Sequence, residues 1–369
     1  MNFNWDNKKI GDIVDIRRGA SPRPIHNFLS TKGMPWVKIA DATSDPSRYI
    51  WGTNEYIINE GVSKSVKVDP ETLIVSNSAT PGLPKIMKIE ACVHDGWLVF
   101  SNYRGVTRDF LYYKFIDIRR MLVNQANGSV FQNLKTDIVR DFNIKIPSID
   151  VQNRIVNILS KLDEKIELNS AINNNLEQQA QAIFDNMFPN ISNGSCAIGD
   201  YITPKRGKSL LSKNAIFGDV PVIAGGLEPS TYHNVANTQS PVLAISASGA
   251  NAGYVSLWNI PIWSSDSSYI DSSMTDDVYF WYVLLKKRQK EIFDAQTGSA
   301  QPHIYPQHIA SMSVSNLDIE KVHSYTSIVT PIFEIIGHHK EENTRLASLR
   351  DTLLPKLMSG ELDVSDIDL

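Results

Sequence analysis

Residues 148–187 are the longest stretch of this chain without glycine or proline, the residues that most destabilise a helix interior. Ser148 or Asp150 can cap its start, and Pro189 and Gly194 end it. At about 1.5 Å per residue, such a helix is a rod of roughly 60 Å. Apolar residues recur along it in alternating steps of four and three, which predicts the seam of a coiled coil. The seam positions are Ile155, Leu159, Leu162, Ile166, Asn169, Asn173, Leu176, Ala180, Ile183 and Met187.

A second helix, predicted for residues 323–359, repeats this seam 170 positions later. Its two polar positions are His339 and Asn343, which match Asn169 and Asn173. If the helices pair antiparallel, Asn169 meets Asn343 and Asn173 meets His339, and this polar layer disfavours slipped registers. The same register places Leu162 opposite Arg350 and Ile183 opposite Val329. The alternative is two ordinary amphipathic helices in which the asparagines coincide by chance.

The segments that precede the two helices also repeat. Ile10-Gly11-Asp12 recurs as Ile198-Gly199-Asp200, and Gly128-Ser129 recurs as Gly298-Ser299. We therefore predict four parts, which are a globular domain over 1–147, a spacer helix over 148–190, a second domain over 191–322, and a spacer helix with a tail over 323–369. A duplicated globule and helix implies a pseudo-dimer in one polypeptide, with pseudo-two-fold symmetry if the halves pack isologously.

Each globular segment is expected to be a mixed α/β (α+β) domain with long loops. Short runs rich in β-branched and aromatic residues, bounded by turn residues, predict the strands. One helix is expected in each domain, over 109–123 and 276–293. The predicted strands are 35–39, 72–76, 85–89, 96–101 and 142–146 in the first domain, and 220–224, 241–246, 252–257 and 261–264 in the second.

Charge and cysteine content limit the possible functions. The net charge of the chain is −4, but residues 1–148 carry a net charge of +5, whereas residues 191–322 carry −2. Any nucleic-acid contact by the second domain must therefore come from a local basic patch. Two cysteines cannot build a disulfide framework or a zinc site, and no stretch is long and apolar enough to span a membrane. A cytoplasmic location is expected.

No catalytic or metal-binding motif is complete in the sequence. Gly207-Lys208-Ser209 resembles the end of a phosphate-binding loop, but Ile202 occupies the position of its first glycine. His338 and His339 are adjacent on a predicted helix and cannot share a metal ion. We expect no catalytic residue and no metal site. An enzyme with an unrecognised site remains the alternative.

Taken in order, these features resemble the specificity (S) subunit of type I restriction–modification systems. The resemblance covers essentially the whole chain. It rests on the repeated Ile-Gly-Asp and Arg-Gly pairs, the two heptad helices, and two sets of motifs. In the first half these motifs are Gly33-Met34-Pro35-Trp36-Val37, Gly128-Ser129-Val130-Phe131-Gln132-Asn133-Leu134, and Ile146-Pro147-Ser148 followed by Gln152. In the second half they are Gly298-Ser299-Ala300-Gln301-Pro302-His303-Ile304 and the helix end over 346–360. The second half has Asp318-Ile319-Glu320 where the first has its Pro-Ser helix entry.

The resemblance implies two target-recognition domains that each recognise one half of a bipartite DNA sequence. The helix pair then sets the spacing between the half-sites. The resemblance also implies that methyltransferase (M) and restriction (R) subunits bind this chain, that the chain itself performs no chemistry, and that S-adenosylmethionine, ATP and Mg²⁺ belong to those partners.

The residues expected to contact DNA form two groups. Basic side chains near the first repeated motif of each domain are candidates for phosphate contacts, with one arginine able to bind guanine through two hydrogen bonds. They are Arg17, Arg18, Arg23, Lys205, Arg206, Lys208 and Lys213. Polar loop residues are candidates for base contacts, and they are Asn77, Ser78, Gln132, Asn133, Gln301 and His303. The alternative for each is a solvated charge or an amide that caps a turn.

Two other functions remain open at this point. The chain could be a coiled-coil scaffold that gathers proteins and binds no DNA, or a stand-alone DNA-binding protein without enzyme partners. A DNA-binding assay with the methyltransferase tests the first alternative, and co-purification tests the second.

Overall fold

The chain divides into two compact units in the computed structural model, which describes residues 5–44, 47–126, 133–298 and 301–364. Unit 1 comprises Met1–Glu167 and Arg345–Leu369, and unit 2 comprises Leu168–Thr344. Each unit therefore contains one globular domain and a segment of each of two long helices, α6 (Ile149–Met187) and α10 (Ile319–Ser359). No helix in the described ranges is long and apolar enough to cross a membrane.

Domain 1, the globular part of unit 1, is built on two five-stranded sheets and one strand pair. Its strands are β1 (Asp6–Lys9), β2 (Asp15–Arg18), β3 (Leu29–Ser30), β4 (Met34–Val37), β5 (Tyr49–Ile50), β6 (Tyr56–Ile57), β7 (Val66–Val68), β8 (Leu73–Ser76), β9 (Pro84–Met87), β10 (Ala91–Val93), β11 (Trp97–Ser101) and β12 (Asn143–Ile146). The sheet orders are β2-β11-β8-β9-β5 and β3-β6-β4-β10-β7, and β1 pairs with β12. The helices are α1 (Ile10–Ile13), α2 (Ile39–Thr43), α3 (Asn59–Val62), α4 (Arg108–Ala126) and α5 (Thr136–Asp141).

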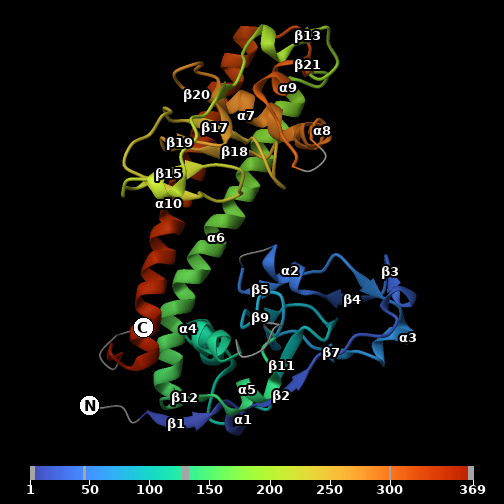
Figure 1. Cartoon of the computed structure of the whole chain (residues 1–369), viewed down its shortest axis with the longest axis vertical. Helices are drawn as coiled ribbons and strands as arrows, with labels where there is room; N and C mark the ends of the chain where they lie inside the picture. The colour runs from blue at the N-terminus through green and yellow to red at the C-terminus, as the bar shows by residue number, and fades with distance from the viewer. Residues whose placement is uncertain (1–4, 45–46, 127–132, 299–300, 365–369) are drawn as a thin grey trace. The chain divides into compact units, whose positions relative to one another are not determined.

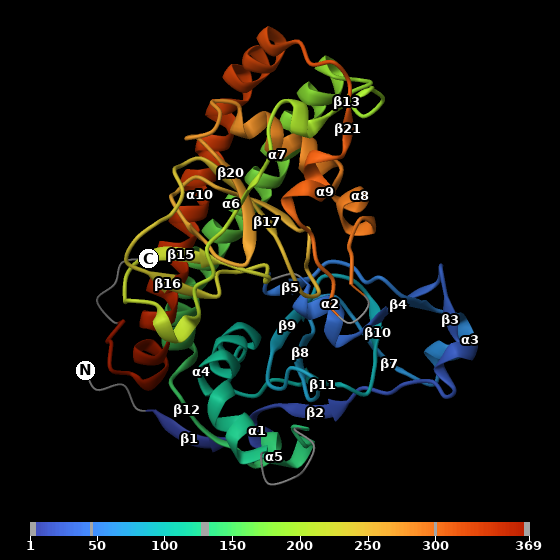
Figure 2. The ribbon, with the colours of Figure 1, turned by 45° about the horizontal axis from the view of Figure 1, so that its top comes forward.

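The core of domain 1 lies between α4 and the first of these sheets. Helix α4 lies beside β9 in both views of the ribbon (Figures 1 and 2). Phe110, Phe115 and Ile118 of this helix are buried in one cluster with Val75 and Leu98 of the strands. Leu111 belongs to the same cluster, and its spacing of four and three from Phe115 and Ile118 places these side chains on the face of the helix that meets the sheet.

Domain 2, the globular part of unit 2, has a smaller version of this architecture. Its strands are β13 (Cys196–Ala197), β14 (Lys205–Arg206), β15 (Val220–Ile223), β16 (Thr231–His233), β17 (Val242–Ser246), β18 (Val255–Trp258), β19 (Trp263–Ser264), β20 (Ser267–Asp271) and β21 (Ser313–Val314). They form sheets of order β14-β20-β17-β18 and β16-β15-β19, and β13 pairs with β21. The helices are α7 (Val278–Lys287), α8 (Gln289–Asp294) and α9 (Pro306–Ala310).

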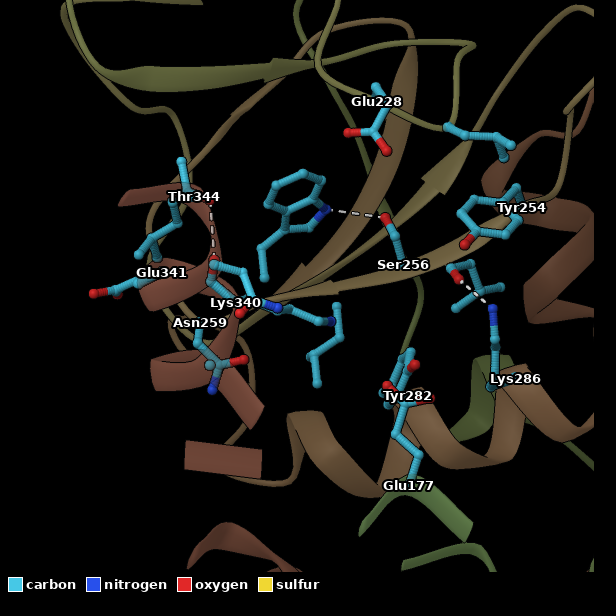
Figure 3. Close-up of a pocket in the computed structure, with 17 residues that line it drawn as sticks. Glu177, Glu228, Tyr254, Ser256, Asn259, Tyr282, Lys286, Lys340, Glu341 and Thr344 are labelled. Carbon is cyan, nitrogen blue, oxygen red and sulfur yellow. Dashed lines mark hydrogen bonds between the residues drawn. The ribbon is translucent and has the colours of Figure 1, made fainter. Parts of the chain in front are cut away.

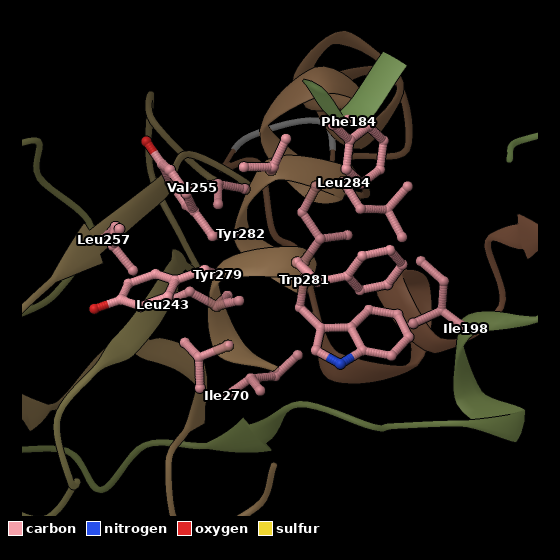
Figure 4. Packing of buried hydrophobic residues seen from close by; sticks show 14 of the residues in the cluster. Phe184, Ile198, Leu243, Val255, Leu257, Ile270, Tyr279, Trp281, Tyr282 and Leu284 are labelled. Carbon is pink, nitrogen blue, oxygen red and sulfur yellow. The ribbon is translucent and has the colours of Figure 1, made fainter. Parts of the chain in front are cut away.

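The core of domain 2 continues into the helix pair. Leu243, Val255 and Ile270 of the sheet pack with Leu284 of α7 in one buried cluster, which also includes Phe184 of α6 (Figure 4). The side chains of Phe184 and Phe280 have ring centroids 5.6 Å apart. One hydrophobic core therefore stabilises the domain and fastens it to α6.

Backbone hydrogen bonds confirm the predicted internal repeat. The Asn77 amide donates to the Gly96 carbonyl (2.8 Å), and 170 positions later the Ala247 amide donates to the Asp266 carbonyl (3.1 Å). Similarly, the bond from the Ile10 amide to the Phe142 carbonyl recurs as one from Ile198 to Met312. Strand β20 is β11 shifted by 170 positions. The two domains are thus two copies of one fold.

The antiparallel register of the helix pair is also confirmed by the bonds of its polar layer in unit 2. Asn169 Nδ2 donates to Asn343 Oδ1 (2.9 Å), and Asn173 Oδ1 lies 2.8 Å from His339 Nδ1. Asn169 is fully buried. Because its amide also donates to Glu342 Oε2 (2.6 Å), a slipped register would break two hydrogen bonds in a buried position.

One predicted helix start is wrong, and two features of the helix pair were not predicted. Helix α10 begins at Ile319 rather than at 323, and Asp318 Oδ1 accepts from the Lys321 amide as a cap. The Arg350 guanidinium pairs with Asp163 of α6 (Nη1–Oδ1, 2.7 Å), the residue after Leu162. Near the end of α6 the fully buried residue is Phe184, while Ile183 is only half-buried. Here α6 packs against α7 as well as α10, so its buried stripe follows steps of four.

The predicted strands are all present, with ends shifted by a few residues. The predicted helix over 276–293 is interrupted at Arg288, where α7 ends and α8 begins. The buried Arg288 guanidinium donates to the Ser313 carbonyl (2.7 Å) and pairs with Glu291. These bonds fix the side chain at the break between the two helices.

Candidate nucleic-acid interface

The candidate site of domain 1 begins on strand β2. This strand pairs with β11, so that Arg17 lies opposite Val99 and Arg18 opposite Leu98. Adjacent strand residues point to opposite faces of a sheet. Accordingly, Arg17 donates from Nη2 to the Lys67 carbonyl (3.0 Å), whereas Arg18 donates from Nε to the Asp95 carbonyl (2.7 Å).

Several polar side chains of this site contact Asp95. Ser21 Oγ donates to Asp95 Oδ1 (2.7 Å), and Arg23 Nη2 lies 3.4 Å from Oδ2. Asn77 Nδ2 donates to the Asp95 carbonyl (3.1 Å). The Ser21 hydrogen bond and the nearby Arg18 guanidinium hold the pKa of the Asp95 carboxyl below its usual value. Asp95 therefore holds Arg18 through its main-chain carbonyl, while its ionised carboxylate lies 3.8 Å from Arg18 Nη2 and 3.4 Å from Arg23 Nη2.

The other predicted residues of domain 1 lie around the same turn, in different environments. Asn77 is buried and bonded, so its amide supports the Asp95 turn, and Ser78 is half-buried beside it. The Leu134 amide donates to the Asn77 carbonyl (2.7 Å), which brings the exposed Asn133 to this loop. Gln132 lies outside the described residues.

The candidate site of domain 2 starts from the matching strand, β14. Lys205 lies opposite Tyr269 and Arg206 opposite Ser268. Arg206 Nη2 pairs with Asp266 Oδ1 (2.6 Å), and Ser248 Oγ donates to Asp266 Oδ2. Asp266 thus fixes an arginine in domain 2, as Asp95 does in domain 1.

The remaining predicted residues of domain 2 lie along the loops next to this pair. His303 forms an isolated β-bridge with Ser248, which bonds to Asp266, and the exposed Gln301 comes two residues earlier. Lys208 and Lys213 are exposed on the loop that follows β14, and the Lys208 carbonyl accepts from Trp263 Nε1 (2.8 Å). The structure therefore brings Arg206, Ser248 and His303 into one chain of contacts, with the lysines on the adjoining loop.

Sequence reasoning missed the two aspartates. Asp95 and Asp266 lie 171 positions apart, within one residue of the repeat offset, and each precedes a matching strand, β11 or β20. That coincidence is the signal that could have identified them. The sequence gives no comparable signal for Ser248, which reaches Asp266 only through the fold.

One cavity lies at the site of domain 1, and another lies in unit 2 apart from the candidate site. In domain 1, a cavity of about 730 Å³ is lined by apolar side chains, among them Pro22 and Trp36, and by polar ones that include Arg23 and Asp95. In unit 2, a cavity of about 440 Å³ lies where domain 2 meets the helices, with Glu177 of α6, Lys286 of α7 and Lys340 of α10 in its lining (Figure 3). Within the described ranges, no group of three histidine, cysteine, aspartate or glutamate residues is placed to hold a metal ion.

Comparison with known proteins finds similarity to the specificity subunits of type I restriction–modification systems. Residues 2–178 match the model of the type I restriction modification DNA specificity domain. The chain is 24% identical over 409 aligned residues to the type I restriction enzyme MjaIX specificity subunit of Methanocaldococcus jannaschii, which covers 99% of this chain and 95% of the relative. It is 25% identical over 273 residues to a putative type I specificity subunit of Mycoplasma pneumoniae, covering 67% and 72% of the two chains.

A solved structure supports the same assignment at the level of the fold. The crystal structure of a type I restriction–modification S subunit from M. genitalium superposes with a TM-score of 0.61 at 18% identity, and the match covers 97% of this chain and 96% of that one. The predicted fold class, two mixed α/β domains with two long antiparallel helices, is therefore confirmed. With a specificity-domain match over residues 2–178 and a relative that aligns over 99% of its length, the chain is similar to the specificity subunits of type I restriction–modification systems.

Proposed function

We propose that this chain recognises a bipartite DNA sequence, with one half-site bound by each domain. One observation carries the proposal, which is that an arginine fixed by an aspartate occurs twice, as Arg18 with Asp95 and Arg206 with Asp266, at matching places in two copies of one fold. Arginines held in a defined geometry suit contacts to guanine and to phosphate. The loops around the two sites differ in sequence, so the two half-sites need not be alike.

We also propose that α6 and α10 set the number of unread base pairs between the half-sites. Dimeric DNA-binding proteins fix such a spacing through the geometry of their dimer, and here a covalent duplication takes the place of the dimer. The buried Asn169–Asn343 pair supports this role because it favours a single register. Inserting one helical turn into both helices should change the gap and leave the bases of each half-site unchanged.

The proposed partners are DNA, methyltransferase subunits and restriction subunits. In this proposal the chain supplies recognition only, and S-adenosylmethionine, ATP and Mg²⁺ act in the partner subunits. Co-purification with a type I methyltransferase subunit tests that part of the proposal. A chain that purifies alone and binds its target with full specificity would instead be a stand-alone DNA-binding protein.

The direct test uses the basic side chains of domain 2. Arg206 and Lys208 are exposed, and the double variant R206A/K208A should weaken DNA binding and make its dependence on salt shallower by about two phosphate contacts. A suitable control is K290A, whose ammonium is exposed and pairs with Asp294 one turn later on α8. An unchanged salt slope in R206A/K208A would place the contact elsewhere, and no DNA binding by the intact complex would favour the protein scaffold.

A further inference from the structure

The loop between β14 and β15 carries three large apolar side chains in solvent. Leu211 is 56% exposed, Ile216 61% and Phe217 95%. Burial of apolar surface is favourable by roughly 25 cal/mol per Å², so a fully exposed phenylalanine forgoes a substantial stabilisation. Isolated apolar residues are common on protein surfaces, but three on one short loop form a patch of the kind that marks an interaction site.

Both ends of this loop are held by one aromatic pair. The Lys208 carbonyl accepts from Trp263 Nε1 (2.8 Å), and the Ile216 amide donates to His233 Nδ1 (3.0 Å). The rings of His233 and Trp263 meet edge to face with centroids 5.0 Å apart. The loop therefore has an ordered base.

The residue after Phe217 keeps the chain close to this base. A Cβ atom at Gly218 would lie 2.4 Å from Asn234 Cα, so only glycine permits the backbone to pass there. The chain is thus anchored immediately before and immediately after Phe217. Holding the backbone around Phe217 in place in advance reduces the entropy lost when its side chain binds a partner.

The loop also adjoins the candidate site of domain 2. The Leu210 amide donates to Ser265 Oγ (2.9 Å), and the next residue, Asp266, pairs with Arg206. Between 204 and 218 every charged residue is basic, and these residues are Lys205, Arg206, Lys208 and Lys213. The loop that carries the exposed apolar side chains therefore also carries basic residues in a domain whose net charge is negative, which complements a polyanion.

We propose that Phe217, with Ile216 and Leu211 beside it, inserts between two stacked base pairs of the DNA bound by domain 2. This inference rests on the proposed function, because it needs domain 2 to bind DNA. Apolar wedges of this kind unstack a base step and bend the duplex, while neighbouring basic residues hold the phosphates. In this arrangement Lys208 and Lys213 lie on the same loop as the wedge.

The corresponding loop of domain 1 does not repeat this feature. It carries Pro22, Pro24 and Ile25, and its most exposed large apolar residue is Leu29 at 41%. We therefore expect an unstacked step in the half-site of domain 2 and none in the half-site of domain 1.

The experiment compares F217A with the parent chain, each bound to its methyltransferase, on a duplex selected by the parent complex. 2-Aminopurine is placed in turn at each step of both half-sites. The parent complex should raise its fluorescence at one step within the half-site of domain 2, and F217A should lose that signal. Affinity should fall about 5- to 50-fold, as for the loss of one base–aromatic contact, and the salt slope should stay unchanged because no phosphate contact is lost.

Two further variants make the test specific. F217L keeps a large apolar side chain and should retain most of the affinity, whereas L227A removes a comparably exposed apolar residue (54% exposed) elsewhere in the domain and should change neither readout. Weaker DNA binding by F217A without any step-specific signal in the parent would overturn the wedge. So would unchanged DNA binding with reduced methyltransferase binding, since the patch would then contact protein. Failure of the parent complex to bind any duplex would instead refute the proposed function.

Discussion

The two domains share a fold but are fastened to the helix pair by different chemistry. In unit 1 a buried ionic cluster adds to a hydrophobic core that includes Ile155 and Leu159 of α6 and Leu354 of α10. Arg48, which is 8% exposed, lies 3.2 Å from Glu164 and 3.4 Å from Glu167 of α6. Tyr113 donates its hydroxyl to Asp163 (2.6 Å), which also pairs with Arg350 of α10. Burial, together with the Asp163 carboxylate, raises the pKa of the Tyr113 hydroxyl, so that it stays protonated as a donor.

In unit 2 the hydrophobic core is joined by a buried hydrogen bond from Thr326 of α10 to Asp277 (2.7 Å) and by an amide beside an aromatic stack. The rings of Tyr279 and Phe333 are stacked with centroids 4.8 Å apart, and Asn259 Nδ2 donates to the Phe333 carbonyl of α10 (3.0 Å). Beside this contact lies the cavity that Glu177, Lys286 and Lys340 line. Burial lowers the pKa of the Lys286 ammonium there. A duplicated fold has therefore kept its backbone while the side chains at each junction diverged.

This difference shows that the internal repeat is preserved in the strands and their register, whereas the contacts with the helices are specific to each copy. A replacement domain would therefore need the matching helix residues, such as Asp163 for domain 1. The four predictions that follow test this view, from the largest expected effect to the smallest.

Removing Asp163 should have the largest effect on stability. The variant D163A leaves the half-buried Arg350 guanidinium and the buried Tyr113 hydroxyl without their shared acceptor. Breaking a buried pair in this way costs about 3 kcal/mol of unfolding free energy. Urea denaturation of the full chain measures the loss. The control K161A changes an exposed residue of the same helix and should stay within about 0.5 kcal/mol of the parent. Equal stability of D163A and K161A would show that the ionic junction does not stabilise unit 1.

Replacing Gly337, at the junction of unit 2, by alanine should have the next largest effect on stability. A Cβ atom at Gly337 would lie 2.7 Å from Cβ and Cγ of Asn259. G337A should therefore lower the unfolding free energy by about 1 to 2 kcal/mol, because the overpacking outweighs the gain in helix propensity.

The double variant separates steric from helical effects at this position. In an N259G background both contacting atoms of residue 259 are absent, so adding G337A should stabilise the chain by up to about 1 kcal/mol. A double-mutant cycle by urea denaturation gives the coupling. The same destabilisation by G337A in both backgrounds would mean that Asn259 does not determine the need for glycine.

Much of this architecture could be predicted from the sequence because it depends on residues that recur at regular intervals. The heptad seam specified the pairing of Asn169 with Asn343, and the 188- and 170-residue offsets specified the repeat. Strand β20 was not predicted, although it is the counterpart of β11. Its sequence begins Ser267-Ser268, and serines ordinarily mark turns, but here the Ser267 hydroxyl donates to the Ile223 carbonyl in the interior.

The candidate site was predictable in its basic residues and not in its organisation. Arg18 and Arg206 stand out because they follow a repeated motif. Asp95 and Asp266 lie more than 50 residues further along the chain, and only the pairing of β2 with β11 and of β14 with β20 brings them to those arginines. A contact that depends on tertiary pairing leaves no local pattern in the sequence.

The polar layer of the helix pair gives a smaller and more specific prediction. The variant N169A removes the buried amide that donates to Oδ1 of the half-buried Asn343 and should cost about 1 to 2 kcal/mol. The double variant N169L/N343L removes both polar groups and should be as stable as the parent or more so, while its register is less well defined. If the double variant is as unstable as N169A, the layer contributes to stability rather than to register. Urea denaturation measures the stability, and gap selectivity in DNA selection measures the register.

The smallest expected effect is the pH-dependent stability that the Asp95 carboxylate contributes at the arginine site of domain 1. Because the folded pKa of Asp95 lies below its unfolded value of about 3.9, its ionised form stabilises domain 1 above that pH. This contribution is lost as the pH falls through the folded pKa. The carboxylate is partly exposed, so solvent screening keeps the effect below about 1 kcal/mol.

Comparing the parent with D95N between pH 2.5 and 7 isolates this contribution. The advantage of the parent should be constant from pH 7 to about pH 5 and should shrink below about pH 4, as the Asp95 carboxyl takes up a proton. A constant difference down to pH 2.5 would mean that the hydrogen bond from Ser21 stabilises the turn without the charge. In that case hydrogen-bond geometry alone would position the arginines of domain 1. The sites of the two domains would then share their backbone arrangement but not the ion pair that Arg206 and Asp266 form in domain 2.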